Sequence, residues 1–168
     1  MKNMLDILLQ LQHEDGSFPR KFHDDFTIVD NSGGSTPSAT LPLIMGYKYF
    51  KDKRYLASAK RTADYLEKVL ISKADYFSST LDANCEDKEA SLYAATATYY
   101  LSLITKGDEH RHYADLTRKA AYFALSWYYV WDVPFAQGQM LGDIGLKTRG
   151  WGNVSVENNH IDVFVFEF

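Results

Sequence analysis

The amino-acid sequence predicts an all-α fold built from pairs of helices. Apolar residues recur at helical spacing along most of the chain, capping residues precede several of these stretches, and short polar turns separate them. The 168 residues are enough for one domain with a sizeable core. We therefore expect residues 1–168 to form a single helical domain.

Composition and charge exclude several classes of protein. An apolar fraction of 46% with 24% charged residues is typical of a globular protein and excludes wholesale disorder. The net charge of -4 provides no basic surface, so neither a nucleic acid nor a membrane partner is expected. No secretory signal and no run of roughly 18 apolar residues is found, which makes the cytoplasm the default expectation. The single cysteine, Cys85, forms no disulfide within the chain.

The first helix is expected over residues 3–12, where apolar residues follow a helical period up to the turn before Gly16. A loop of about twenty residues follows, which is uncommon in a compact domain unless it covers a site or a packed face. Ser35-Thr36-Pro37 then begins a second helix that should run to about residue 50. Because an interior proline costs about 3 kcal/mol, Pro42 predicts either a kink or a later start near residue 41.

The later helices alternate with turns and longer loops. An amphipathic helix is expected over residues 55–72, and a helix that is apolar on nearly all sides over residues 85–105. Residues 109–131 predict another amphipathic helix, in which Trp127 and Trp131 are one turn apart and are expected in the core. A glycine-rich loop then leads to a final helix that should begin at Asn159.

Two of the expected helix starts share one pattern of polar residues. Asn84 can cap the helix over residues 85–105, with Asp87 completing a capping box from the third helical position. Asn159 and Asp162 occupy the matching places before the final helix. We expect these two helix starts to line a common pocket.

The helices also form an internal repeat, in which each unit is a loop, a capped buried helix, a tight turn and an amphipathic helix. Residues 54–65 align with residues 112–123, with Tyr55 over Tyr113 and Ala63 over Ala121. Successive αα-hairpins of this kind are expected to curve into a two-layered arc.

Three stretches, residues 8–19, 82–89 and 151–164, resemble the six-hairpin glycosidase-like superfamily of (α/α) toroids. The Leu-Gln-x-x-Asp-Gly-Ser-aromatic phrase in the first stretch is also similar to one in terpenoid cyclase and prenyltransferase toroids, so it indicates architecture more than function. The resemblance implies αα-hairpin repeats that form part of an (α/α) toroid. It also implies a carbohydrate-active protein, most often a glycoside hydrolase, with its site where loops and inner-helix N-termini converge.

A closed ring of six hairpins needs more helices than the five and the beginning of a sixth that the sequence indicates. The chain also stops at Phe168 inside an apolar run. An incomplete toroid is therefore expected, either open or completed by hairpins in a longer product or in a second subunit.

Hydrolysis of a glycosidic bond requires one carboxyl group to protonate the leaving oxygen and a second one nearby to activate water or attack the sugar. Acidic residues near the two helix starts are the candidates, with Asp143 further away: Asp82, Glu86, Asp87, Glu89, Asp143, Glu157 and Asp162. We select Asp82, Asp87 and Asp162 as catalytic residues. Capping of free N–H groups is the alternative role of Asp87 and Asp162, whereas Asp82 lies outside the helix and ranks first.

The residues expected to bind a saccharide are polar or flat: Glu86, Arg149, Trp151, Asn159 and His160. Trp151 lies in a loop between two glycines, where packing does not explain it, so it is the preferred stacking residue. Zinc-ligand and phosphate-cradling spacings do not occur, so no metal or other cofactor is expected.

Two further readings remain open. A polysaccharide lyase would use Arg149 or an asparagine amide to neutralise a uronate and His160 as a base. A non-catalytic helical-repeat module would instead bind a partner on its aromatic inner surface.

Overall fold

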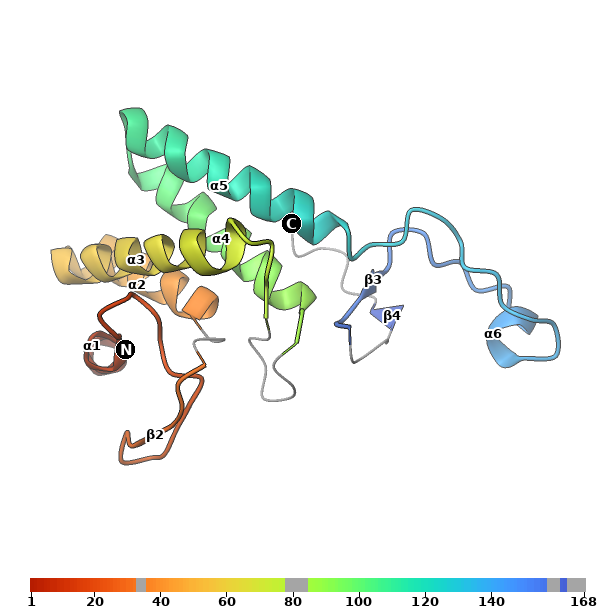
Figure 1. Cartoon of the computed structure of the whole chain (residues 1–168), viewed down its shortest axis with the longest axis horizontal. Helices are drawn as coiled ribbons and strands as arrows, with labels where there is room; N and C mark the ends of the chain where they lie inside the picture. Colours follow the sequence, from red (N-terminus) through yellow and green to blue (C-terminus); the bar gives the residue numbers. More distant parts are fainter. Residues whose placement is uncertain (33–35, 78–84, 157–160, 163–168) are drawn as a thin grey trace.

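The computed structural model describes residues 1–32, 36–77, 85–156 and 161–162. These residues are mostly helical, which confirms the all-α prediction (Figure 1). The helices, in chain order, are α1 (Lys2–Leu11), α2 (Thr36–Phe50), α3 (Lys53–Tyr65), a π-helical turn (Leu66–Ile71), α4 (Lys88–Ile104), α5 (Gly107–Leu125) and α6 (Met140–Asp143). Short strands form two antiparallel pairs, β1 (Lys21–Phe22) with β2 (Ile28–Asp30), and β3 (Gly152–Asn153) with β4 (Ile161–Asp162).

Four helices make up the body of the molecule. Helix α3 packs on α2, α5 packs on α4, and α2 packs on α4, while α1 lies against α2 and α3. The chain then leaves the body after α5, and α6 lies at the far end of this excursion (Figure 1). None of the helices in the described part is both long and apolar enough to span a membrane.

Pro42 lies inside helix α2 and does not mark its start. The helix runs without a break from Thr36 to Phe50 and includes Pro42. It therefore begins at the Ser-Thr-Pro start signal rather than near residue 41. Farther along α2, Gly46 lets α1 approach closely, because a Cβ atom there would lie 2.5 Å from Leu5 Cδ1.

The helix predicted over residues 55–72 changes its winding instead of continuing as an α-helix. It is α-helical to Tyr65 and then π-helical from Leu66 to Ile71. At the junction the Leu66 N–H is shared between the carbonyls of Ala63 and Thr62. The wider turn buries the side chains of Leu66, Leu70 and Ile71.

The core lies between α2, α3, α4 and α5. Small residues occur where α4 and α5 face their neighbours, so the helix backbones approach closely and larger side chains of α2 and α3 fill the space between them. Fully or almost fully buried members include Leu43, Ile44, Tyr55, Ala59, Ala90, Ala94, Leu101, Leu116 and Ala120.

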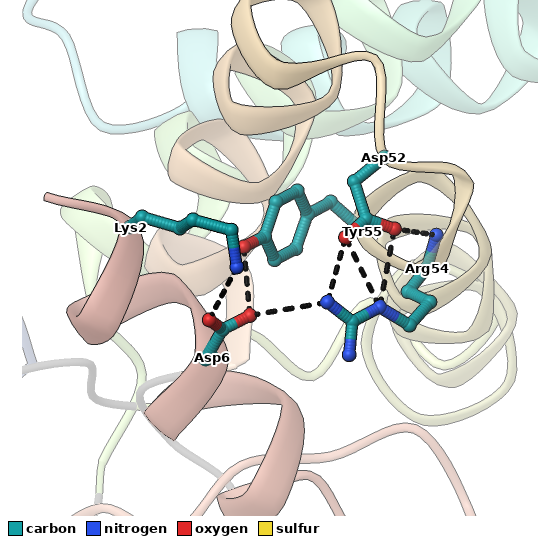
Figure 2. A network of polar contacts seen from close by, with 5 residues as sticks. All are labelled: Lys2, Asp6, Asp52, Arg54 and Tyr55. Atoms are coloured by element: carbon teal, nitrogen blue, oxygen red, sulfur yellow. Dashed lines mark hydrogen bonds and ion pairs between the residues drawn. The ribbon is translucent and has the colours of Figure 1, made fainter.

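A polar network ties α1 to the start of α3 (Figure 2). The buried Tyr55 hydroxyl donates to Asp6 Oδ1 at 2.8 Å, and Lys2 Nζ donates to Asp6 Oδ2 at 2.7 Å. Asp52 caps α3 by accepting the Arg54 N–H at 2.9 Å, and the Arg54 guanidinium binds Asp52 Oδ2 at 2.7 Å. The bonds from Arg54 lower the pKa of Asp52 to about 2.

Replacing Tyr55 by phenylalanine tests this network. Tyr55→Phe keeps the ring in the core but removes the hydroxyl that donates to Asp6, so the substitution should lower the urea concentration at the midpoint of unfolding. Tyr49→Phe is the control because Tyr49 is 78% exposed. Equal midpoints for the two variants would show that the hydroxyl does not hold α1 in place.

Candidate functional site

The start of α4 is capped by Asp87, which is the residue immediately before the helix. Asp87 has extended backbone angles, and its Oδ1 accepts the N–H groups of Glu89 at 2.6 Å and Ala90 at 3.4 Å. The predicted capping box is therefore wrong for Asp87, since α4 begins at Lys88 and Asp87 is the N-cap instead of the third helical residue. Asn84 lies outside the described residues. With Asp87 only 2% exposed, this geometry favours the capping interpretation of its carboxylate.

Two segments from distant parts of the chain enclose the start of α4. On one side the Asp87 N–H donates to the Tyr76 carbonyl at 2.9 Å. On the other side the Lys88 N–H donates to the Val154 carbonyl at 3.0 Å, and the Val156 N–H donates to the Glu86 carbonyl at 3.2 Å. The loop after α5 is thus joined to the first turn of α4 by backbone hydrogen bonds.

The second predicted helix start is wrong where the structure describes it. Ile161 and Asp162 form β4, and their pairing partners in β3 are Asn153 and Gly152 respectively. Pairing with β3 holds Ile161 and Asp162 in an extended conformation. The backbone of Asp162 consequently lies beside β3, which leads directly into the segment bound to α4.

The other predicted site residues are spread over several places. Glu86 lies just before the α4 cap and Glu89 lies in the first turn of α4. The Arg149 N–H donates to Asp132 Oδ1 at 3.1 Å, and Asp143, in α6, accepts the Gly138 N–H at 2.9 Å. Asp82, Glu157, Asn159 and His160 lie outside the described residues, as does the side chain of Asp162.

Glu86 is half-buried against the segment before it. Both of its carboxylate oxygens accept the Tyr76 N–H, at 3.1 and 3.2 Å. Burial raises the pKa of Glu86 and the negative charge of Asp75 adds to this increase, whereas the hydrogen bond from Tyr76 opposes it. The start of α4 therefore holds a carboxyl group whose ionisation is disfavoured by folding.

A pH titration of stability tests this environment. Because the pKa of Glu86 is raised above its ordinary value of 4.5, the unfolded chain ionises first, and the stabilisation by protonated Glu86 is lost as pH rises through the folded-state pKa. Glu86→Gln cannot ionise. Its melting temperature relative to wild type should rise between about pH 4 and about pH 7. A difference that stays constant over this range would contradict the assignment, and Glu14→Gln, at an exposed position, serves as the control variant.

An aromatic cleft lies next to the start of α4. It has a volume of about 300 Å³ and is lined by Ser126, Trp127, Tyr128, Tyr129, Trp131 and Asn153. The rings of Tyr129 and Trp131 meet edge to face with centroids 6.4 Å apart. Trp127 Nε1 is buried and has no hydrogen-bond partner within the described residues. The cleft combines the flat faces of four aromatic residues with two polar residues, Ser126 and Asn153.

The prediction that Trp127 and Trp131 lie in a helix and in the core is wrong. Helix α5 ends at Leu125, so neither tryptophan belongs to it, and Trp131 is 59% exposed instead of buried in the core. The chain turns at this point because it pairs with a later segment. The Asn153 N–H donates to the Trp127 carbonyl at 2.8 Å, and the Tyr129 N–H donates to the Trp151 carbonyl at 2.9 Å.

Trp151, the predicted stacking residue, therefore lies on the segment that faces the aromatic run and is half-buried there. The sequence interpretation assigned Trp127 and Trp131 to the core and did not select the other cleft residues. The signal that could have revealed them is the run Trp-Tyr-Tyr-Val-Trp at residues 127–131, whose composition favours strand over helix.

Within the described ranges, no group of three or more His, Cys, Asp or Glu residues is arranged to hold a metal ion. Comparison with known proteins finds no family model that matches the chain and no solved structure that matches it.

Proposed function

We propose that this protein is carbohydrate-active and that the aromatic cleft binds a saccharide. The observation that carries the proposal is the group of four aromatic side chains around one open cleft with an asparagine at its edge. A sugar ring has an apolar face of C–H groups and a rim of hydroxyl groups. Indole and phenol rings can pack on that face, while Ser126 and Asn153 place polar side chains in the lining, next to the hydroxyl groups.

The architecture that accords with this proposal is an incomplete (α/α) toroid of αα-hairpins. Packing of α3 on α2 and of α5 on α4, with α2 against α4, supports it as two adjacent hairpins. The resemblance to six-hairpin glycosidases supports the same interpretation. In such an arrangement the start of α4 and the neighbouring loops form the binding face.

Glycoside hydrolysis is the reaction we propose for this site, with Asp82 and Asp162 as the carboxyl pair. The support is positional: the Asp162 backbone pairs with β3, which also contributes Asn153 to the cleft, and Asp82 precedes the α4 cap in sequence. Asp87 then serves mainly to hold α4 in register through its cap. A polysaccharide lyase that uses Arg149 and His160 is the alternative chemistry.

Removal of one indole face tests saccharide binding. Trp131→Ala should weaken binding of the tightest ligand among maltohexaose, cellohexaose, xylohexaose and oligogalacturonate by about tenfold, because the sugar loses a stacking surface. Isothermal titration calorimetry measures the affinity. Tyr122→Ala is the matched control, since Tyr122 is an aromatic on α5 that is 69% exposed and outside the cleft.

The binding proposal fails if the wild-type chain binds none of these oligosaccharides, or if the two variants bind equally well. Absence of binding to all four oligosaccharides would favour the non-catalytic interaction module. A specific observation supports this second candidate: an apolar groove of about 350 Å³ along α4 and α5, lined by Leu92, Ala95, Thr96, Tyr99, Tyr100, Thr117 and Ala121.

The hydrolytic step has its own test. With the bound oligosaccharide as substrate, Asp82→Asn and Asp162→Asn should each reduce the release of reducing ends by about a hundredfold or more, because each removes a proton-transferring or attacking group. Asp87→Asn should keep the rate, since asparagine caps a helix as well as aspartate does. Unsaturated products that absorb ultraviolet light would identify a lyase, and full activity of both Asp82→Asn and Asp162→Asn would refute the assignment of the carboxyl pair.

A further inference from the structure

Lys88, the first residue of α4, is completely buried. Lysine is almost never buried to this extent unless its charge is paired or otherwise stabilised. Its backbone N–H binds the Val154 carbonyl at 3.0 Å, which anchors the residue between α4 and the segment that follows β3. The ammonium nitrogen Nζ lies 5.8 Å from the centroid of the Tyr128 ring, within the range of a cation–π interaction.

Gly152 completes this packing from the β3 side. A Cβ atom at Gly152 would lie 3.3 Å from Lys88 Cδ and 3.4 Å from both Lys88 Nζ and Tyr128 Cε1. The backbone of Gly152 also forms an antiparallel bridge with Tyr128. The lysine side chain, the phenol ring and the glycine are therefore in close mutual contact.

Tyr128 belongs to two environments at once. Its ring contacts the buried lysine, and it is also part of the wall of the aromatic cleft. Lys88 does not line the cleft. The Tyr128 ring therefore connects the buried cation to the space that a ligand would occupy in the cleft.

We propose that Lys88 is a positioning residue for the aromatic cleft, in which it fixes the plane of the Tyr128 ring that a saccharide contacts. This inference rests on the proposed saccharide binding. The attraction between the ammonium group and the ring face favours one ring orientation, and the absence of a side chain at Gly152 gives the lysine room to adopt it. The first residue of α4 thereby determines the orientation of one wall of the cleft.

A double-mutant cycle tests the proposal with the oligosaccharide that the wild-type chain binds most tightly among the four named above. Lys88→Met keeps the length of the side chain without its charge and should weaken binding by about tenfold, whereas Lys88→Arg should recover most of the affinity. In the Tyr128→Leu background, Lys88→Met should produce no further loss. The exposed Lys68→Met serves as the matched control.

Independent losses from Lys88→Met and Tyr128→Leu would overturn the proposal, because the lysine would then act on the cleft without the ring. If Lys88→Met does not fold, Tyr128→Leu alone decides, since unchanged affinity would show that this ring has no role in binding. A near-ultraviolet circular dichroism spectrum in the absence of sugar separates the two proposals. Should wild type bind no saccharide, a spectral change that Lys88→Met causes only when Tyr128 is present would still support positioning, and its absence would refute it.

Discussion

The backbone hydrogen bonds around the first turn of α4 are the interaction on which the rest of the structure depends. Asp87 donates to Tyr76 while its carboxylate caps the helix, and Lys88 donates to Val154 on the opposite side. Free N–H groups at a helix start are costly to bury without partners. Satisfying them from two distant segments joins the loop before α4 and the loop after α5 into one unit.

The cleft follows from this connection. Because Val154 is bound to α4, β3 lies beside the aromatic run after α5, and the Trp127 carbonyl and the Tyr129 N–H find partners in the segment at residues 151–153. The aromatic side chains are then held at the surface rather than drawn into the core. Trp131 remains 59% exposed and forms part of the cleft wall.

Much of the helical framework could be predicted from the sequence, because apolar periodicity and start signals are local properties of the chain. The Ser-Thr-Pro signal correctly placed the start of α2, and the period of α5 was correct up to Leu125. The prediction failed after that residue. Trp127 and Trp131 have the spacing of a helical stripe, but the same residues also suit an extended chain, and periodicity cannot separate these possibilities in so short a run.

The sequence by itself determined where most helices form and that Asp87 lies at the start of one of them. Only the tertiary structure decided that Asp87 is the cap itself, that Asp162 belongs to a strand, and that the aromatic run forms a cleft. The physical reason is that these outcomes depend on backbone partners ten or more residues away. Asp87 bonds to Tyr76, Asp162 pairs with Gly152, and Lys88 bonds to Val154, and no local pattern contains that information.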